Sequence, residues 1–399
     1  MTTHQEAGQG GGLTPKLLLL AACASRRQAG ALAGPIREAA GNISAWQEVV
    51  AAVHRHRMAA IVWKGLNIAG CSLPADVEVA LRNAATRDIR QIVRLVAEAA
   101  TIQALLAASG LKVMMAKGPA LSLQAFGDMT LRQCRDLDLL VKPDDILQAR
   151  RILIDAGFNQ NFPKGMDDES ELKLWLWMKK DLAFDGPSGA TIELHSRLQR
   201  NPHIFNEATL QHESVRLAPN VTVEALSGDD LFIYLCLHGS GHLWERMKWL
   251  ADVAALIDRD PSRLPLLWKR ARAEGSAVAV GLALRLCNRI FGTEIPPQIR
   301  RDLDRIWRLR FLEANSFAAM TDKETGPERK FGSTKMILLT ALLRLEPRFI
   351  LHEMAHALID WSTVAAFGGT RRAVFFSILL RPATWSWTAV KRLRGKENP

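Results

Sequence analysis

The sequence predicts an α+β fold, in which a small mixed β-sheet core is flanked by N-terminal and C-terminal helical regions. Two observations support this prediction. Residues 16–109 and 227–399 carry apolar side chains that recur at the spacing of an α-helix. Residues 110–226 contain short apolar runs separated by Gly, Pro and Asp, which is typical of buried strands. The expected order is therefore a helical region, an α/β core and a second helical region.

The N-terminal helical region follows a Gly-rich and polar segment. Residues 1–15 are expected to be disordered, because they hold too few apolar side chains to pack. Within 16–109, Asn42-Ile43-Ser44 and Ser72-Leu73-Pro74 are typical of helix starts. Ser109-Gly110 ends the last helix of this region, since Gly readily adopts the left-handed conformation that closes a helix.

Strand and helix signals alternate in the α/β core. A short apolar run ends at Lys117-Gly118, and Pro119 then suits the first turn of a helix. The segment from Asp185 to Gly189 favours a hairpin turn between two later strands. The expected strands are 111–116, 136–141, 182–184, 190–195 and 221–226. Helices are expected over 119–126 and 143–156.

The C-terminal region, 227–399, is expected to be helical and to end in a basic tail. Ser227-Gly228-Asp229-Asp230 resembles a capping box and opens the first helix. A polar loop is expected over 322–333. The expected helices are 229–239, 243–259, 262–273, 277–291, 297–319, 334–345, 347–362 and 371–380.

The net positive charge favours anionic partners but does not identify one. The 399 residues carry a net charge of +11, and in the last thirty residues seven basic side chains stand against Glu397 alone. A basic balance favours anionic partners such as nucleotides, nucleic acid or anionic lipid. The segment 373–380 and the aromatic and basic residues after it predict either peripheral contact with an anionic membrane or a helix that covers the core.

Cysteine usage and the absence of a targeting pattern predict a cytoplasmic protein. The five cysteines are scattered and lack the spacing of metal ligands, which fits a reducing compartment. Leu20-Ala21-Ala22-Cys23 resembles a lipoprotein cleavage site, but the apolar stretch before it is shorter than the roughly 7–15 residues of a signal peptide. The sequence contains no run of about 20 apolar residues, so no transmembrane helix is expected.

Three acidic residues lie within predicted strands. Asp136 and Asp138 are two positions apart, so they share one face of a strand, while Leu137 and Leu139 face the opposite side. Glu193 lies between apolar residues on a later strand. Clustered carboxylates suit divalent cations, and three on adjacent strands fit a two-metal site for phosphoryl transfer. An Asp-x-Asp on a solvated sheet edge is the alternative.

The segment before these acids suits phosphate binding. A strand that ends at Lys117-Gly118 and is followed by a helix presents backbone N–H groups to an anion. Lys117 adds a positive charge for a triphosphate. The substitution Asp138→Asn is expected to preserve or raise the stability of the metal-free protein, because it relieves repulsion among the three clustered acids.

Three segments of the chain carry a family resemblance. They are KGPALSLQAFGDMTLRQCRDLDLLVKPDDILQARRILIDAGF, TIELHSRL and LCLHGSGHLWERMKWLADVAALI. They resemble a largely uncharacterised bacterial nucleotidyltransferase family of the DNA polymerase β-type nucleotidyltransferase superfamily. Its signature is a Gly at the end of one strand, an Asp-x-Asp on the next and a third carboxylate on a later strand. Gly118, Asp136, Asp138 and Glu193 match that signature in order, and the resemblance is strongest over about 111–260.

The resemblance implies a metal-dependent transfer of a nucleoside monophosphate from an NTP to an acceptor hydroxyl, with release of pyrophosphate. Asp136, Asp138 and Glu193 would be catalytic and would hold two Mg²⁺ ions, with Mn²⁺ as a substitute. ATP is the expected NTP. The acceptor is a small molecule, a peptide or a protein, and no stable nucleic acid partner is expected.

Further residues match the family pattern at positions that suggest substrate contact. Lys117, Gly118 and Arg132 would orient the triphosphate, although Arg132 has the alternative of pairing with Asp128 or Asp136. The candidate substrate-binding residues are His195, His238, His242 and Asp252. For the histidines, hydrogen bonds between helices are the alternative.

Two features favour other functions. His352-Glu353-Met354-Ala355-His356 forms a His-Glu-x-x-His string, which on a helix binds Zn²⁺ in metallopeptidases. Ser362 stands where the extended motif has a third His, so the sequence offers no clear third ligand. Pro119 lacks an N–H next to Gly118 and favours a catalytically degenerate nucleotide-binding module.

Overall fold

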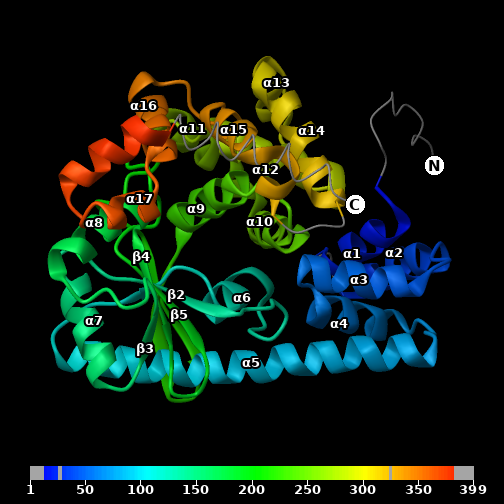
Figure 1. Cartoon of the computed structure of the whole chain (residues 1–399). Helices are drawn as coiled ribbons and strands as arrows, with labels where there is room; N and C mark the ends of the chain where they lie inside the picture. The colour runs from blue at the N-terminus through cyan, green and yellow to red at the C-terminus, as the bar shows by residue number, and fades with distance from the viewer. Residues whose placement is uncertain (1–12, 26–28, 323–325, 382–399) are drawn as a thin grey trace, which may run out of the picture.

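The computed structural model of the protein describes residues 13–25, 29–322 and 326–381. It confirms the predicted α+β class, with one seven-stranded sheet between two sets of helices (Figure 1). Most of the segment predicted to be disordered, residues 1–15, lies outside the described residues, and Pro15 begins the first helix. Residues 382–399, the basic tail on which the predicted membrane contact depends, also lie outside them.

Five helices precede the sheet. They are α1 (Pro15–Ala24), α2 (Ala29–Gly41), α3 (Trp46–His56), α4 (Ala59–Ala69) and α5 (Ala75–Ala108). The expected helix starts agree with α3 and α5 within two residues. Pro74 precedes α5, and Asp76 and Glu78 lie in its first turn, where carboxylates interact favourably with the helix dipole.

The sheet has the strand order β3-β4-β5-β2-β1-β7-β6. The strands are β1 (Met114–Met115), β2 (Asp136–Leu140), β3 (Asn159–Phe162), β4 (Asp181–Asp185), β5 (Thr191–His195), β6 (His212–Ala218) and β7 (Val221–Leu226). Three helices lie between strands: α6 (Pro119–Phe126), α7 (Ile146–Asp155) and α8 (Glu169–Lys179). The sheet is mixed, because β2 runs parallel to β5 whereas β1 and β2 are antiparallel.

The two strands missing from the sequence prediction are the edge strands β3 and β6. Both are largely polar, with sequences NQNF and HESVRLA, and their side chains are mostly exposed or half-buried. An edge strand pairs on one side only and needs no apolar run, so its sequence resembles a loop. Their pairing with β4 and β7 forms the two ends of the sheet.

The C-terminal helices pack on the opposite side of the sheet from α5 (Figure 1). They are α9 (Gly228–Gly241), α10 (Met247–Arg259), α11 (Leu264–Glu274), α12 (Ala277–Phe291), α13 (Pro297–Arg305), α14 (Trp307–Thr321), α15 (Pro327–Ala341), α16 (Pro347–Leu358) and α17 (Trp361–Ala366). A short 3-10 turn, η1 (Pro261–Arg263), precedes α11, and residues 371–381 are also helical.

Several C-terminal boundaries differ from the prediction. The loop expected over 322–333 is wrong from Pro327 onward, where α15 begins. The helix expected over 297–319 divides at Ile306, and the helix expected over 347–362 divides at Ile359-Asp360. At each of these two divisions, a residue in the extended conformation interrupts an apolar pattern that continues on both sides.

The long helix α5 covers one face of the sheet. Its apolar residues from Ile92 to Leu106 pack with Leu137, Leu139, Ile192 and Leu194 in one buried cluster. Among the described residues, α5 is the one helix long and apolar enough to cross a membrane by length and composition, and 39% of its most apolar stretch is buried. The core helix of a soluble protein meets the same criterion, so the length and composition of α5 alone do not indicate a membrane span.

Candidate active site

The pairing of β2 with β5 brings the predicted acids together. The two strands are parallel, and Asp138 lies directly opposite Glu193, with Leu140 opposite His195. Side chains alternate along a strand, so Asp136, Asp138, Glu193 and His195 all face the side away from α5. The leucine and isoleucine side chains between them fill the core under α5. The alternation therefore places the charged residues toward α9 and the C-terminal helices.

Asp138, Glu193 and His195 form a compact group. One ligand atom from each lies within 4.8 Å of the others, the only such group of three found among the described residues. The Nε2 atom of His195 lies 3.5 Å from an oxygen of Asp138 and 3.4 Å from an oxygen of Glu193. This buried nitrogen makes no well-directed hydrogen bond to either carboxylate. Two carboxylates brought this close together suit a divalent cation.

Lys117 partly compensates the negative charge of the group. Its Nζ atom lies 3.1 Å from Asp138, and both side chains are almost fully buried. Burial alone would lower the pKa of Lys117, but the charge of Asp138 raises it above its ordinary value. Burial conversely opposes the ionised form of Asp138, yet Lys117 and His195 hold the pKa of its carboxyl well below its usual range. The pair is therefore ionised on both sides.

Asp136 has a different electrostatic environment. Burial, followed by the charges of Asp138 and Glu193, raises the pKa of its carboxyl. Asp136 lines the same cavity as the other acids, although it is not part of the compact group. An added positive charge in this place would relieve the repulsion that Asp136 experiences.

Lys180 adds a second cation that the sequence did not indicate. Its Nζ atom lies 3.0 Å from Nδ1 of His195. Burial lowers the pKa of Lys180 despite the neighbouring carboxylates, of which Asp181 has the largest effect. Lys180 lies in the left-handed turn between α8 and β4, and no motif marks that position.

A cavity of about 490 Å³ opens in front of these residues. The sheet forms its floor. Tyr234 and His238 line it from α9, His242 from the residue that directly follows α9, and Trp249 from α10. The two imidazole rings are 4.9 Å apart. Burial and the charge of Lys117 lower the pKa of His242 to about 4 and lower that of His238 well below its ordinary value. Both rings are therefore neutral near pH 7 and line the cavity, and their contact with a substrate stays a prediction.

Arg132 is held by Asp252. Its Nε atom donates to both carboxylate oxygens, at 3.0 and 2.9 Å, so neither Asp128 nor Asp136 is its partner. Asp252 is fully buried and, in contrast to Arg132, does not line the cavity. Among the sequence candidates, Asp252 is thus placed behind Arg132 rather than toward a substrate. Asp128 instead accepts hydrogen bonds from Lys64 and Thr130.

Gly118 determines the local path of the chain. It has a φ of 81°, which favours glycine, and it directly precedes α6. Pro119 occupies the first turn of that helix, as predicted. Gly118 itself does not line the cavity, whereas Lys117 before it does. The conformation of Gly118 therefore allows the chain to turn from β1 into α6 directly after Lys117.

The lining of the cavity includes residues that sequence reasoning missed. Arg57, at the left-handed end of α3, lines it, as do Arg200 and Asn201 after β5. These residues lie on connections far apart in the chain, and no spacing pattern links them. Glu353 of the His-Glu-x-x-His string reaches the same cavity from α16.

The string does not form a three-residue metal site within the described residues. Glu353 is buried and accepts hydrogen bonds from Arg200 at 2.6 Å and from Asn201 at 2.9 Å. The rings of His352 and His356 are 4.4 Å apart on one face of α16. The acid that a metallopeptidase would use as a general base is thus bound to an arginine and an amide.

A comparison with protein families identifies the family of the chain. The model of a family described as uncharacterised nucleotidyltransferase matches residues 43–292, which is more than half of the chain. The match runs from the start of α3 to the end of α12, so it contains the acids of β2 and β5 and excludes His352 and His356. No curated protein matches the chain. The chain therefore belongs to this family of uncharacterised nucleotidyltransferases.

Proposed function

We propose that the protein transfers a nucleoside monophosphate from an NTP to an acceptor hydroxyl and releases pyrophosphate. The observation that carries this proposal is the register of β2 with β5, which sets Asp138 opposite Glu193 and both beside His195. The group faces a cavity of about 490 Å³, a volume in the usual range of small-molecule sites. The resemblance to the DNA polymerase β-type superfamily supports the same reaction.

Asp136, Asp138 and Glu193 would hold two Mg²⁺ ions, for which Mn²⁺ could substitute. When bound, the ions would neutralise charge that develops on the transferred phosphoryl group. The mutual arrangement of the acids supports this role, because Asp136 carries a raised pKa next to two other carboxylates. His195 would adjust its contacts with Asp138 and Glu193 when the ions bind.

Other residues of the cavity would position the substrates. Lys117 and Arg132 would orient the triphosphate, and Gly118 would allow the chain to present Lys117 at the edge of the cavity. Glu193 is the most accessible acid of the compact group, with 36% of its side chain exposed against 9% for Asp138. We therefore assign to Glu193 the contact with the acceptor hydroxyl. His238 and His242 would contact the base, sugar or acceptor as neutral rings.

The expected donor is ATP, the acceptor is a small molecule, peptide or protein, and the reaction would take place in the cytoplasm. The proposal predicts that one of four labelled NTPs, incubated with Mg²⁺ and a cell extract, labels a product and releases pyrophosphate. Asp136→Asn should abolish the labelling. Asp185→Asn is the matched control, because Asp185 lies exposed on β4 outside the cavity.

The same assay distinguishes the degenerate alternative. Pro119 at the start of α6 offers no N–H to a phosphate, which would weaken binding there. NTP binding without label transfer in any extract would favour a nucleotide-binding module. The absence of any Mg²⁺-dependent NTP binding would overturn the proposal.

A further inference from the structure

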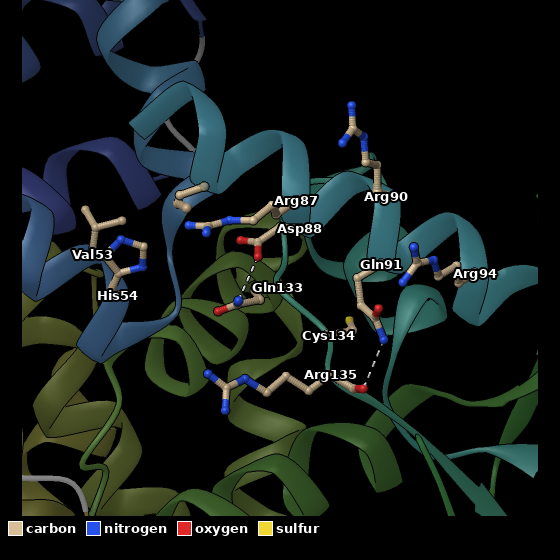
Figure 2. Close-up of a pocket in the computed structure, with 12 residues that line it drawn as sticks. Val53, His54, Arg87, Asp88, Arg90, Gln91, Arg94, Gln133, Cys134 and Arg135 are labelled. Carbon is tan, nitrogen blue, oxygen red and sulfur yellow. Dashed lines mark hydrogen bonds between the residues drawn. The ribbon is translucent and has the colours of Figure 1, made fainter. Parts of the chain in front are cut away.

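A second cavity, of about 500 Å³, lies beside the start of β2 (Figure 2). Its walls come from α3, the start of α4, the middle of α5 and the loop that leads into β2. The loop contributes Gln133, Cys134 and Arg135, and Arg135 directly precedes Asp136. None of these walls belongs to the candidate active site, so this cavity requires its own explanation.

The walls of this cavity carry an excess of unpaired positive charge. Arg87 and Arg94 are seven positions apart on α5, which places them on one face of the helix. Arg135 extends from the facing loop, and Figure 2 shows Arg87 and Arg135 reaching toward His54. The three side chains are exposed, and within the described part of the chain none of their guanidinium groups forms an ion pair or a hydrogen bond.

A buried acid in the same cavity lacks a donor. Asp88 is 8% exposed, and one of its oxygens accepts a hydrogen bond of 2.7 Å from Gln133. Its other oxygen, Oδ2, is buried and has no hydrogen-bond partner among the described residues. Burial raises the pKa of Asp88 to about 6, despite that hydrogen bond and the charge of Arg87. An unpartnered buried oxygen is costly unless a ligand supplies a donor.

We propose that this cavity binds a small phosphate ester that also carries a hydroxyl or amino group. Arg87 and Arg135 would bind the phosphate, because a guanidinium presents its N–H groups in a fork that matches phosphate oxygens. The hydroxyl or amino group would donate to Oδ2 of Asp88. A carboxylate inside the cavity disfavours a nucleic acid backbone, which would bring a continuous row of negative charges. The proposal stands independently of the transferase reaction.

Ribose 5-phosphate is a suitable probe, since it combines a phosphate with several hydroxyl groups. In calorimetric titrations of the full chain, it should bind more tightly than inorganic phosphate or ribose alone. Arg87→Ala and Arg135→Ala should each weaken its binding about tenfold, as expected for the loss of a charge-assisted hydrogen bond. Asp88→Asn should reduce the affinity for ribose 5-phosphate toward that for phosphate and should not weaken phosphate binding.

Arg82→Ala is the matched control. Arg82 lies exposed on the same helix, and it does not line this cavity. This variant should bind ribose 5-phosphate as the wild type does. Arg87→Lys, which keeps the charge and loses the fork, should give an intermediate affinity and covers the case in which Arg87→Ala does not fold.

Three results would overturn the proposal. Equal weakening by Arg87→Ala and Arg82→Ala would indicate a general effect of surface charge. Binding that survives Arg87→Ala and Arg135→Ala would place the probe elsewhere, for example near Lys117. Tight binding of a short single-stranded oligonucleotide that competes with ribose 5-phosphate would indicate a nucleic acid surface instead of a small-molecule site.

Discussion

Two clusters around the same cavity contain an acid next to histidine, and they differ in what their acids contact. The sheet cluster consists of Asp138, Glu193 and His195, and the helix cluster of His352, Glu353 and His356. Glu193 is partly exposed toward the cavity and has no hydrogen-bond donor closer than His195 among the described residues. Glu353 is bound by both Arg200 and Asn201. Similar residue types therefore form an open site in one place and a structural contact in the other.

The pKa values of the histidines also differ between the two clusters. Burial would lower the pKa of His195, but its contacts with Asp138 and Glu193 raise it. Burial and the neighbouring charge of His352 instead lower the pKa of His356 to about 3. The carboxylates of the sheet cluster therefore favour positive charge on His195, whereas the surroundings of His356 disfavour it. A sequence motif names the residue types, whereas the surrounding donors determine whether the acid is available.

The largest expected effect separates the two aspartates of β2. Both Asp136→Asn and Asp138→Asn should reduce metal-dependent NTP turnover by orders of magnitude, since an amide is a poor ligand for Mg²⁺. Their stabilities should change in opposite directions. Asp138→Asn leaves Lys117 buried without its carboxylate, which should cost about 3–5 kcal/mol. Asp136→Asn removes a carboxyl with a raised pKa and should preserve or raise stability.

Thermal melts and turnover assays on the same preparations test this prediction. Asp185→Asn should change neither quantity, since it lies outside the cavity. Retained turnover in Asp136→Asn, with a validated acceptor, would show that the assigned acid cluster is not the active site. Equal melting temperatures for the two variants would show that the Lys117–Asp138 pair contributes little to folding.

The two aspartates of β2 show which part of the site the sequence predicts and which part it does not. The period of two in a strand predicts that Asp136 and Asp138 share a face, and their pairing with Glu193 requires only that the strands be neighbours. The sequence also predicts relief of repulsion for Asp138→Asn, whereas the buried pair with Lys117 leads us to expect a loss of stability at this position. Lys117 is nineteen positions from Asp136 and its pairing depends on how β1 packs against β2, which no local pattern specifies.

The fold shows the same division between local and non-local information. Apolar periodicity identifies the helical regions and the central strands, because those elements bury a face against the core. Apolar periodicity does not predict the edge strands β3 and β6, since their residues are largely polar and half-exposed. The partners of Arg132 and Glu353 were also missed. Asp252 and Arg200 lie more than one hundred residues away in the chain, so only the tertiary structure brings them together.

A smaller effect is expected from removing the acid of the helix cluster. Glu353→Gln keeps the hydrogen bond to Asn201 and loses the ion pair with Arg200, whose side chain is 46% exposed. Because solvent screens such a pair, we expect a loss of about 1 kcal/mol of stability. NTP turnover should change by less than about twofold, since Glu353 holds no metal in the proposed site. A loss of turnover comparable to that of Asp136→Asn would contradict the structural role of Glu353.

The histidines of the helix cluster predict a modest dependence of stability on pH. His356 has a pKa of about 3 in the folded protein and near 6.5 when unfolded. The unfolded chain thus binds more protons between these values, so stability falls as pH falls from about 6.5 toward 3. His356→Phe retains a ring beside Trp177 and cannot titrate. Denaturation at several pH values should show a shallower acid decline in this variant, and an unchanged decline would refute the assignment.

The smallest expected effect is that His356→Ala leaves the zinc content of the protein unchanged. Nδ1 of His352 and Nε2 of His356 are buried without hydrogen-bond partners among the described residues, so two nitrogens are available to a metal. A protein zinc site usually needs at least three ligands, however, and Glu353 is already bound by Arg200 and Asn201. We therefore expect elemental analysis of the purified protein to find no stoichiometric zinc in either form. Stoichiometric zinc that disappears in His356→Ala would make the helix cluster a metal site and would remove the difference between the two clusters. Because the cavity contacts both of them, zinc lost instead in Glu193→Gln would assign the metal to the sheet cluster and preserve that difference.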